Sequence, residues 1–179
     1  MVGPRKPRKL DADALWEYAL RVLGQRAQST SEVKQKLARR ANQLADVAAV
    51  MAKLREYGLT DDLKFSEACA ASRLQNQGFG RVRVLRDLRS KRVSSTVAET
   101  VVDKTFAGTE ERDLIEKFLA RKYRGKNLAQ LLKDQKQLAG AYRRLRTAGF
   151  SSSASISVLK QYAQTVEDWA EPEEEIGES

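Results

Sequence analysis

Apolar residues recur along most of this 179-residue chain at intervals of three and four positions, the spacing of one face of an α-helix. Proline is absent between Pro7 and Pro172, and this stretch is rich in the strong helix formers Ala, Leu, Arg, Lys, Glu and Gln. No segment keeps the strict apolar–polar alternation of a half-buried strand. The pattern therefore predicts an all-α protein.

Three helical patterns precede Gly58. The first runs over about Asp11 to Gln25, and the second follows the cluster 29–31 of Ser and Thr, whose side chains can accept the free amide hydrogens of a helix start. Asp46 is the expected N-cap of the third, which Gly58 ends. The apolar positions expected to face a core include Leu15, Tyr18, Ala19, Val22, Leu23, Val33, Leu37, Val47, Val50, Met51 and Leu54.

The same pattern then occurs twice more. If Leu37, Leu88 and Leu145 are equivalent, the positions four residues before and thirteen and fourteen residues after them also match. The matched sets are Val33, Val84 and Ala141; Val50, Val101 and Val158; and Met51, Val102 and Leu159. We predict three tandem three-helix repeats, spaced 51 and 57 residues apart, that form an elongated, curved molecule. Chance agreement among helices rich in Ala and Val is the alternative.

The predicted organisation is a basic flexible N-terminal tail, three repeats and an acidic disordered C-terminal tail. Their residues are 1–10, 11–58, 59–107, 108–166 and 167–179, in that order. The acidic tail holds seven carboxylates, and without them the formal charge of +9 becomes +16 over residues 1–166. Such an excess favours a polyanionic partner, which can be nucleic acid, an acidic protein surface or an anionic membrane. A basic surface that is merely solvated is the alternative.

The chain lacks the residues that several classes of catalytic and metal-binding site require. The chain has no histidine and one cysteine, Cys69, and it contains neither a GxxxxGK[ST] phosphate loop nor a Cys pair that could bind zinc. We therefore expect no enzyme, no cofactor and no metal. No apolar run approaches the roughly 20 residues that span a bilayer, and the short basic start lacks the apolar stretch of a secretory signal. A cytoplasmic protein without membrane contact is the expectation.

Two adjacent carboxylates, Asp61 and Asp62, are the most conspicuous acidic pair. They follow the helix end at Gly58 and directly precede a new helical pattern that begins before Phe65. A magnesium pair would need further oxygen ligands or a phosphate substrate. Carboxylates at this place accept free amide hydrogens and face the positive end of the helix dipole. We interpret the pair as a helix cap.

The basic residues are the better candidates for function. In the helical segment 81–92, Val84 and Leu88 share the apolar face, which places Arg83 and Arg86 on the opposite side and Arg89 at its flank. Arginine suits the fork geometry of carboxylate and phosphate better than lysine does. The candidate binding residues are Arg73, Arg83, Arg86, Arg89, Lys91, Arg92, Arg121, Lys122, Arg124, Arg143 and Arg144.

Two segments, YGLTDDLKFSEACAASRLQNQGFGRVRVLRDLRSKRV (57–93) and LRTAGFSSSASISVLKQY (145–162), resemble the RecX family of bacterial regulators of the recombinase RecA. The resemblance extends over about residues 14–165. It rests on Gly58-Leu59 with Asp61-Asp62 before Phe65, on Arg73 with the glycines at 78 and 80, on the helix end at 88–93, and on Gly149-Phe150 with its serine cap. The segment 29–37 is similar to the signature of the family's first repeat.

The resemblance implies tandem three-helix repeats that bind the RecA–DNA filament along its groove, and we expect a monomer. It implies restraint of filament extension, ATP hydrolysis and strand exchange, without enzymatic activity. The third repeat departs from the family pattern through a longer linker at 125–134 and through Thr147-Ala148, where a basic pair is expected. One rival hypothesis is a helical module that binds bare single- or double-stranded DNA without RecA, and another is an adaptor for a different acidic protein.

Overall fold

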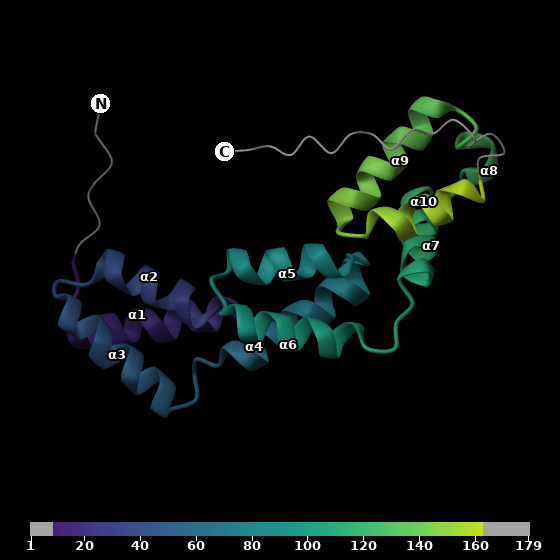
Figure 1. Cartoon of the computed structure of the whole chain (residues 1–179). Coiled ribbons are helices and arrows are strands. Elements are labelled where there is room, and N and C mark those ends of the chain that lie inside the picture. The colour runs from purple at the N-terminus through teal and green to yellow at the C-terminus, as the bar shows by residue number, and fades with distance from the viewer. Residues whose placement is uncertain (1–8, 163–179) are drawn as a thin grey trace, which may run out of the picture. The chain divides into compact units, whose positions relative to one another are not determined.

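A computed structural model describes residues 9–162, and the secondary structure in that range is helical apart from one isolated bridge between Leu10 and Ala41. The all-α prediction is therefore confirmed. The chain divides after Gly108 into an N-terminal unit and a C-terminal unit (Figure 1). The tails predicted at 1–10 and 167–179 lie almost entirely outside the described residues.

The first repeat consists of α1 (Ala12–Gln25), α2 (Thr30–Arg40) and α3 (Leu44–Glu56). A capping box starts α2, because the Ser29 side chain accepts from the amide of Glu32 while the Glu32 carboxylate accepts from the amide of Ser29. Both α2 and α3 pack against α1. The buried core of this repeat contains Leu15, Ala19, Val33, Leu37, Ala41, Val47, Val50, Met51 and Leu54.

The second repeat consists of α4 (Asp62–Ser72), the π-helical turn η1 (Arg73–Gln77), α5 (Arg81–Ser90) and α6 (Ser95–Phe106). Gly78 ends η1 with φ 62°, a left-handed conformation that glycine adopts without a side-chain clash. The α4 helix packs most extensively against α6. The buried core contains Ala70, Val84, Leu88, Val93, Ala98, Val101 and Val102, and Phe79 packs against it.

The C-terminal unit consists of α7 (Glu111–Lys122), the single-turn α8 (Leu128–Leu131), α9 (Gln135–Ala148) and α10 (Ser152–Lys160). The short α8 occupies the longer linker that distinguishes the third repeat. Both α7 and α9 pack against α10. The fully buried side chains include Ile115, Leu119, Leu132, Leu145, Phe150, Val158 and Leu159.

The positions matched between the repeats are buried in each of them. Leu37, Leu88 and Leu145 all have 0% of their surface exposed. The other three matched sets are also buried: Val33, Val84 and Ala141; Val50, Val101 and Val158; and Met51, Val102 and Leu159. Equivalent residues are thus buried in the core of each repeat. The helical-repeat prediction is confirmed, while the exact repeat boundaries stay predictions.

The helix starts agree with the sequence in most places and differ in one. Asp61 accepts from the amides of Leu63 and Lys64 at 3.0 Å and so caps α4, as interpreted from the sequence. The prediction for Asp46 was wrong, because α3 already begins at Leu44 and Asp46 lies within its first turn. An acidic side chain there still faces the positive end of the helix dipole.

Candidate polyanion-binding surface

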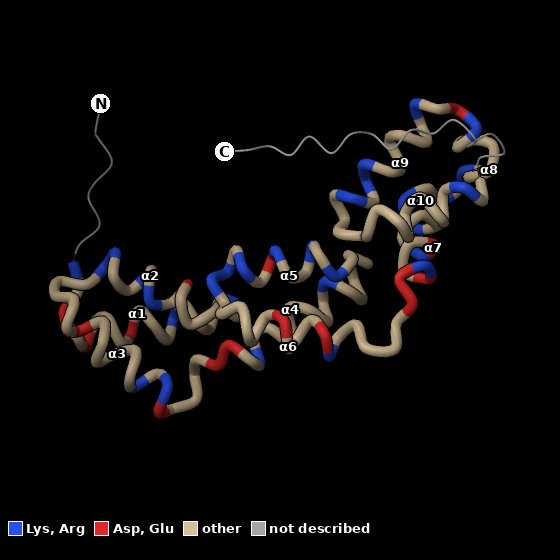
Figure 2. The backbone as a smooth tube through the Cα atoms, viewed as in Figure 1, with Lys and Arg blue, Asp and Glu red and all other residues tan. Residues whose placement is uncertain are grey.

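The second helix of each repeat carries the largest excess of positive charge. The lysines and arginines are Lys34, Lys36, Arg39 and Arg40 on α2; Arg81, Arg83, Arg86 and Arg89 on α5; and Lys136, Arg143, Arg144 and Arg146 on α9. In the N-terminal unit, α2 and α5 follow one edge, and most of the acidic positions lie on the other helices (Figure 2). The basic residues of α2 were missed at the sequence level, although Lys34, Lys36, Arg39 and Arg40 lie close together in the sequence.

The end of α5 meets the start of α2 at a junction between the first two repeats. The Ser29 hydroxyl donates to the Lys91 carbonyl at 2.6 Å, and the Ser31 hydroxyl donates to the Arg92 carbonyl at 3.2 Å. Asp62 accepts from the amide of Thr30 at 2.7 Å, so this carboxylate of the acidic pair caps a helix of the other repeat. The junction therefore joins the two basic helices end to end.

Lys91 belongs to this junction. Its ammonium lies 3.0 Å from Oε1 of Glu32, and that carboxylate also accepts from Arg26 at 3.2 Å. Burial raises the pKa of Glu32, but the hydrogen bonds from Lys91, from the Ser29 amide and from Arg26 outweigh it, so the pKa lies below its usual value. The Lys91 charge is thus partly neutralised within the protein.

Arg73 and Arg83 share one carboxylate. Arg73 Nε and Arg83 Nε each lie 3.0 Å from an oxygen of Asp87, and all three side chains are at most about a third exposed. Arg73 also donates to Gln77 at 2.6 Å, and the Arg83 guanidinium lies 5.1 Å from the centre of the Phe79 ring. These contacts join η1 to α5, so both arginines stabilise this corner of the second repeat.

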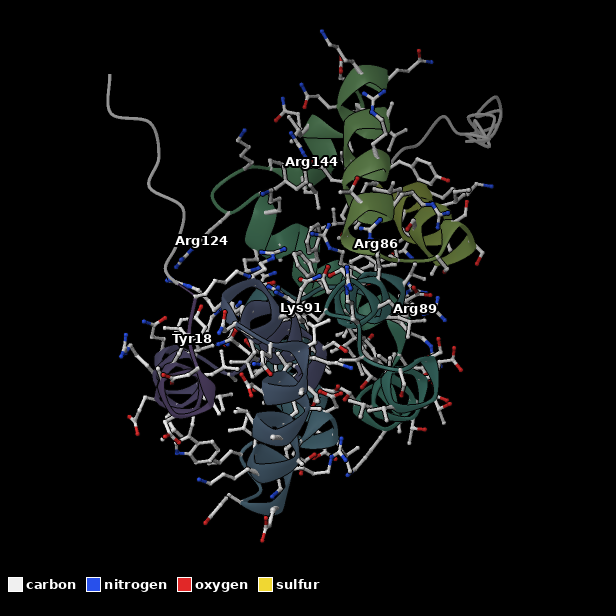
Figure 3. All side chains as sticks on the ribbon, turned by 90° about the vertical axis from the view of Figure 1, so that its left-hand side faces the viewer. Tyr18, Arg86, Arg89, Lys91, Arg124 and Arg144 are labelled. Carbon is white, nitrogen blue, oxygen red and sulfur yellow. The ribbon has the colours of Figure 1, made fainter. Side chains whose placement is uncertain are left out.

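Arg86, Arg89 and Arg92 are exposed. Arg89 lies 2.8 Å from Glu99 in a pair whose side chains are both about half exposed, so solvent and salt weaken the interaction. Figure 3 looks along the N-terminal unit and shows Arg86 and Arg89 on one side of Lys91. Among the predicted residues of this unit, Arg86, Arg89 and Arg92 are therefore the ones that solvent reaches most readily.

The other predicted residues lie in the C-terminal unit. Arg144 on α9 donates to the Tyr123 hydroxyl at 2.6 Å and lies 5.5 Å from the centre of that ring, which follows the end of α7. Tyr123 itself lies between Lys122 and Arg124 in the chain. The five predicted residues of this unit, of which Arg124 and Arg144 are labelled in Figure 3, are Arg121, Lys122, Arg124, Arg143 and Arg144, all exposed.

Residues 9–162 contain no group of His, Cys, Asp and Glu side chains that could hold a metal ion. The same residues include no helix that is long and apolar enough to cross a membrane. Cys69 is half-buried, and burial raises the pKa of its thiol, which favours the unreactive protonated form at neutral pH. What the described side chains do offer is arginine and lysine for phosphates or carboxylates.

Comparison with known proteins places this arrangement in a class of regulatory proteins. Residues 61–102 match the family model described as RecX, second three-helix domain. A regulatory protein RecX of Mycobacterium sp. (strain JLS) is 32% identical over 146 residues, which are 79% of this chain and 78% of the relative. One from Halorhodospira halophila is 36% identical over 92 residues, or 51% of this chain, and the alignment spans only 56% of that relative.

The fold agrees with the same class. The crystal structure of RecX from Lactobacillus salivarius matches with a TM-score of 0.62 at 19% identity, covering 84% of this chain and 96% of that one. At this identity the match concerns the fold alone. Taken with the sequence relatives, these findings show that the chain belongs to the RecX family.

Proposed function

We propose that the protein regulates the recombinase RecA by binding the RecA–DNA filament along its groove. Binding there would restrain filament extension, ATP hydrolysis and strand exchange in recombination and DNA repair. Membership of the RecX family, whose members are named regulatory proteins, is the observation that carries the proposal. The protein would act as a cytoplasmic monomer, without a cofactor and without enzymatic activity.

The basic second helices support this proposal physically. On α2 and α5 the positive charges follow one edge of the N-terminal unit (Figure 2), and a row of cations attracts a polymer that repeats its negative charge. Tandem repeats would also contact several neighbouring subunits of a filament at once, which raises the overall affinity without any single strong contact.

A titration of RecA's DNA-dependent ATP hydrolysis tests the proposal. We expect the full chain to lower the steady-state rate of ATP hydrolysis when far fewer copies of it than of RecA are present. One molecule bound to a filament would affect many RecA subunits. Electron microscopy of the same mixtures should show shorter filaments. An unchanged hydrolysis rate and filament length at every ratio would rule the proposal out.

Binding to bare DNA is the second candidate, and the basic residues of α2 and α5 favour it as well. Fluorescence anisotropy with labelled single-stranded and double-stranded oligonucleotides, without RecA, separates the two. A module for bare DNA would bind with an affinity that falls steeply with salt, at a slope that reports the number of phosphates contacted. Inhibition of RecA at salt concentrations where no binding to bare DNA remains would favour the filament.

A further inference from the structure

A groove between α2 and α3 of the first repeat is independent of the α5 arginines. Its walls are formed chiefly by Lys34 and Ala38 of α2 and by Leu44, Ala48, Ala52 and Arg55 of α3. Leu44, at the start of α3, is 76% exposed and extends the apolar lining of the groove. Small alanine side chains along both walls allow another backbone to approach closely.

In the second repeat, ion pairs bridge α5 and α6, the helices that correspond to α2 and α3. At the 51-residue offset, Ala38 and Ala48 correspond to Arg89 and Glu99, which lie 2.8 Å apart across α5 and α6. Thr30 and Ala52 correspond to Arg81 and Asp103, which form a second cross-helix pair. Both pairs are replaced in the first repeat by residues that cannot form them, so the apolar groove there remains uncovered.

The charges around the groove limit what can occupy it. No carboxylate lines it, while Lys34 stands on one wall and Arg55 on the other. A second copy that docked the same groove face to face would bring these cations against themselves, which is unfavourable. A partner with apolar side chains flanked by carboxylates would match both the walls and the cations.

We propose that the α2–α3 groove binds an acidic amphipathic helix of a partner protein. Such a helix places apolar residues at i, i+3, i+4 and i+7 on one face, which would lie along the line of Leu44, Ala48 and Ala52. Glutamates or aspartates beside that face would pair with Lys34 and Arg55. The proposal goes beyond binding to the RecA–DNA filament and does not depend on it.

The test measures binding of a fluorescein-labelled helical peptide with leucine at these four spacings and glutamate at the other positions. Fluorescence anisotropy with the full chain should show saturable binding. The double variant Ala38→Arg/Ala48→Glu transfers the Arg89–Glu99 pair of the second repeat to the groove without changing the net charge. It should weaken binding about tenfold or more, equivalent to about 1.4 kcal/mol.

Two controls make this result specific. Ala49→Glu changes the neighbouring exposed residue on α3, which does not line the groove, and should leave the affinity unchanged. Circular dichroism and thermal unfolding of each variant check that the repeat stays folded. Equal binding by the wild type and the folded double variant would overturn the proposal.

A second arm tests the charge selection. The double variant Lys34→Ala/Arg55→Ala should weaken binding of the glutamate peptide. Binding of a peptide with glutamine in place of glutamate should be weakened less. A lysine version that binds as tightly as the glutamate peptide would contradict the proposal. So would absence of peptide binding together with self-association that Ala38→Arg/Ala48→Glu abolishes, because the groove would then be an interface between copies.

Discussion

Single backbone positions differ between otherwise equivalent repeats. Arg92 has φ 59°, the left-handed conformation that Gly149 adopts with φ 91° at the matching position of the third repeat. A residue with a Cβ atom pays a steric cost there that glycine avoids. The Arg92 guanidinium can offset part of it, because both of its terminal nitrogens approach the side-chain oxygen of Gln35 once that amide is oriented to accept.

Replacing Arg92 separates the backbone effect from the side-chain effect. Arg92→Gly and Arg92→Ala both remove the guanidinium, so we expect the glycine variant to be more stable by about 1 kcal/mol because only the alanine stays strained. Urea unfolding measures the difference. At Arg86, inside α5, the order should reverse, with alanine more stable by about 1 kcal/mol. The same order at both positions would contradict the assignment of strain to Arg92.

Gln43 is an N-cap without a capping bond. It precedes α3 and makes no side-chain hydrogen bond to the helix, whereas Ser94 and Ser151 cap α6 and α10 at the corresponding positions. We expect Gln43→Ser to raise the free energy of unfolding by about 1 kcal/mol, since one free amide gains an acceptor. The reciprocal change, Ser94→Gln, should lower it by a similar amount. Thermal unfolding of both variants checks the pair of predictions.

At the scale of the elements, we expect the junction between α2 and α5 to be sensitive to pH. The pKa of Glu32 is lower in the folded protein than in the unfolded chain, so its stabilising effect is fully present above the ordinary glutamate pKa of about 4.3. That effect is lost as the pH falls through the lower pKa of the folded state, because protonation removes the acceptor of Lys91 and Arg26.

Glu32→Gln tests this linkage. At pH 7 the variant should be less stable than the wild type by about 1 kcal/mol, and the difference should shrink as the pH falls below about 4.3. Denaturant unfolding at a series of pH values measures it. A constant difference across the series would contradict the role given to the Glu32 carboxylate.

At the scale of the whole molecule, the proposed function depends on charge that the fold leaves accessible. Arg73, Arg83 and Lys91 pair with carboxylates that are mostly buried, whereas Arg86 is exposed and Arg89 lies in a half-exposed pair with Glu99. Reversing the charge of Arg86 and Arg89 tests the exposed basic surface of α5 without disrupting the cluster around Asp87.

Arg86→Glu/Arg89→Glu should raise the concentration needed to inhibit RecA's ATP hydrolysis about tenfold, because two phosphate or carboxylate contacts become repulsive. Lys64→Glu/Lys104→Glu changes the net charge equally at highly exposed positions on α4 and α6 and should have little effect. Helicity measured by circular dichroism should stay unchanged in both. Equal loss in the two variants would indicate a dependence on net charge alone.

The sequence predicted the repeated core well because helical packing depends on periodicity, which is local. Val33, Val84 and Ala141 could be matched by spacing alone, and all three are fully buried. The candidate site was harder, because the sequence shows a charge but not its partner. Arg73 occupies the position of the buried Val22 of the first repeat and pairs with a carboxylate from α5, a contact that no spacing rule predicts.

The chain by itself therefore determined the helical class, the three-fold recurrence and the excess of positive charge, since each follows from residue type and spacing along one dimension. The tertiary structure decided which lysines and arginines pair with mostly buried carboxylates and which are exposed to solvent. It also decided that Asp61 and Asp62 cap helices of different repeats, and that ion pairs bridge α5 and α6 where α2 and α3 carry a groove. Those outcomes depend on contacts between residues distant in sequence, which only folding brings together.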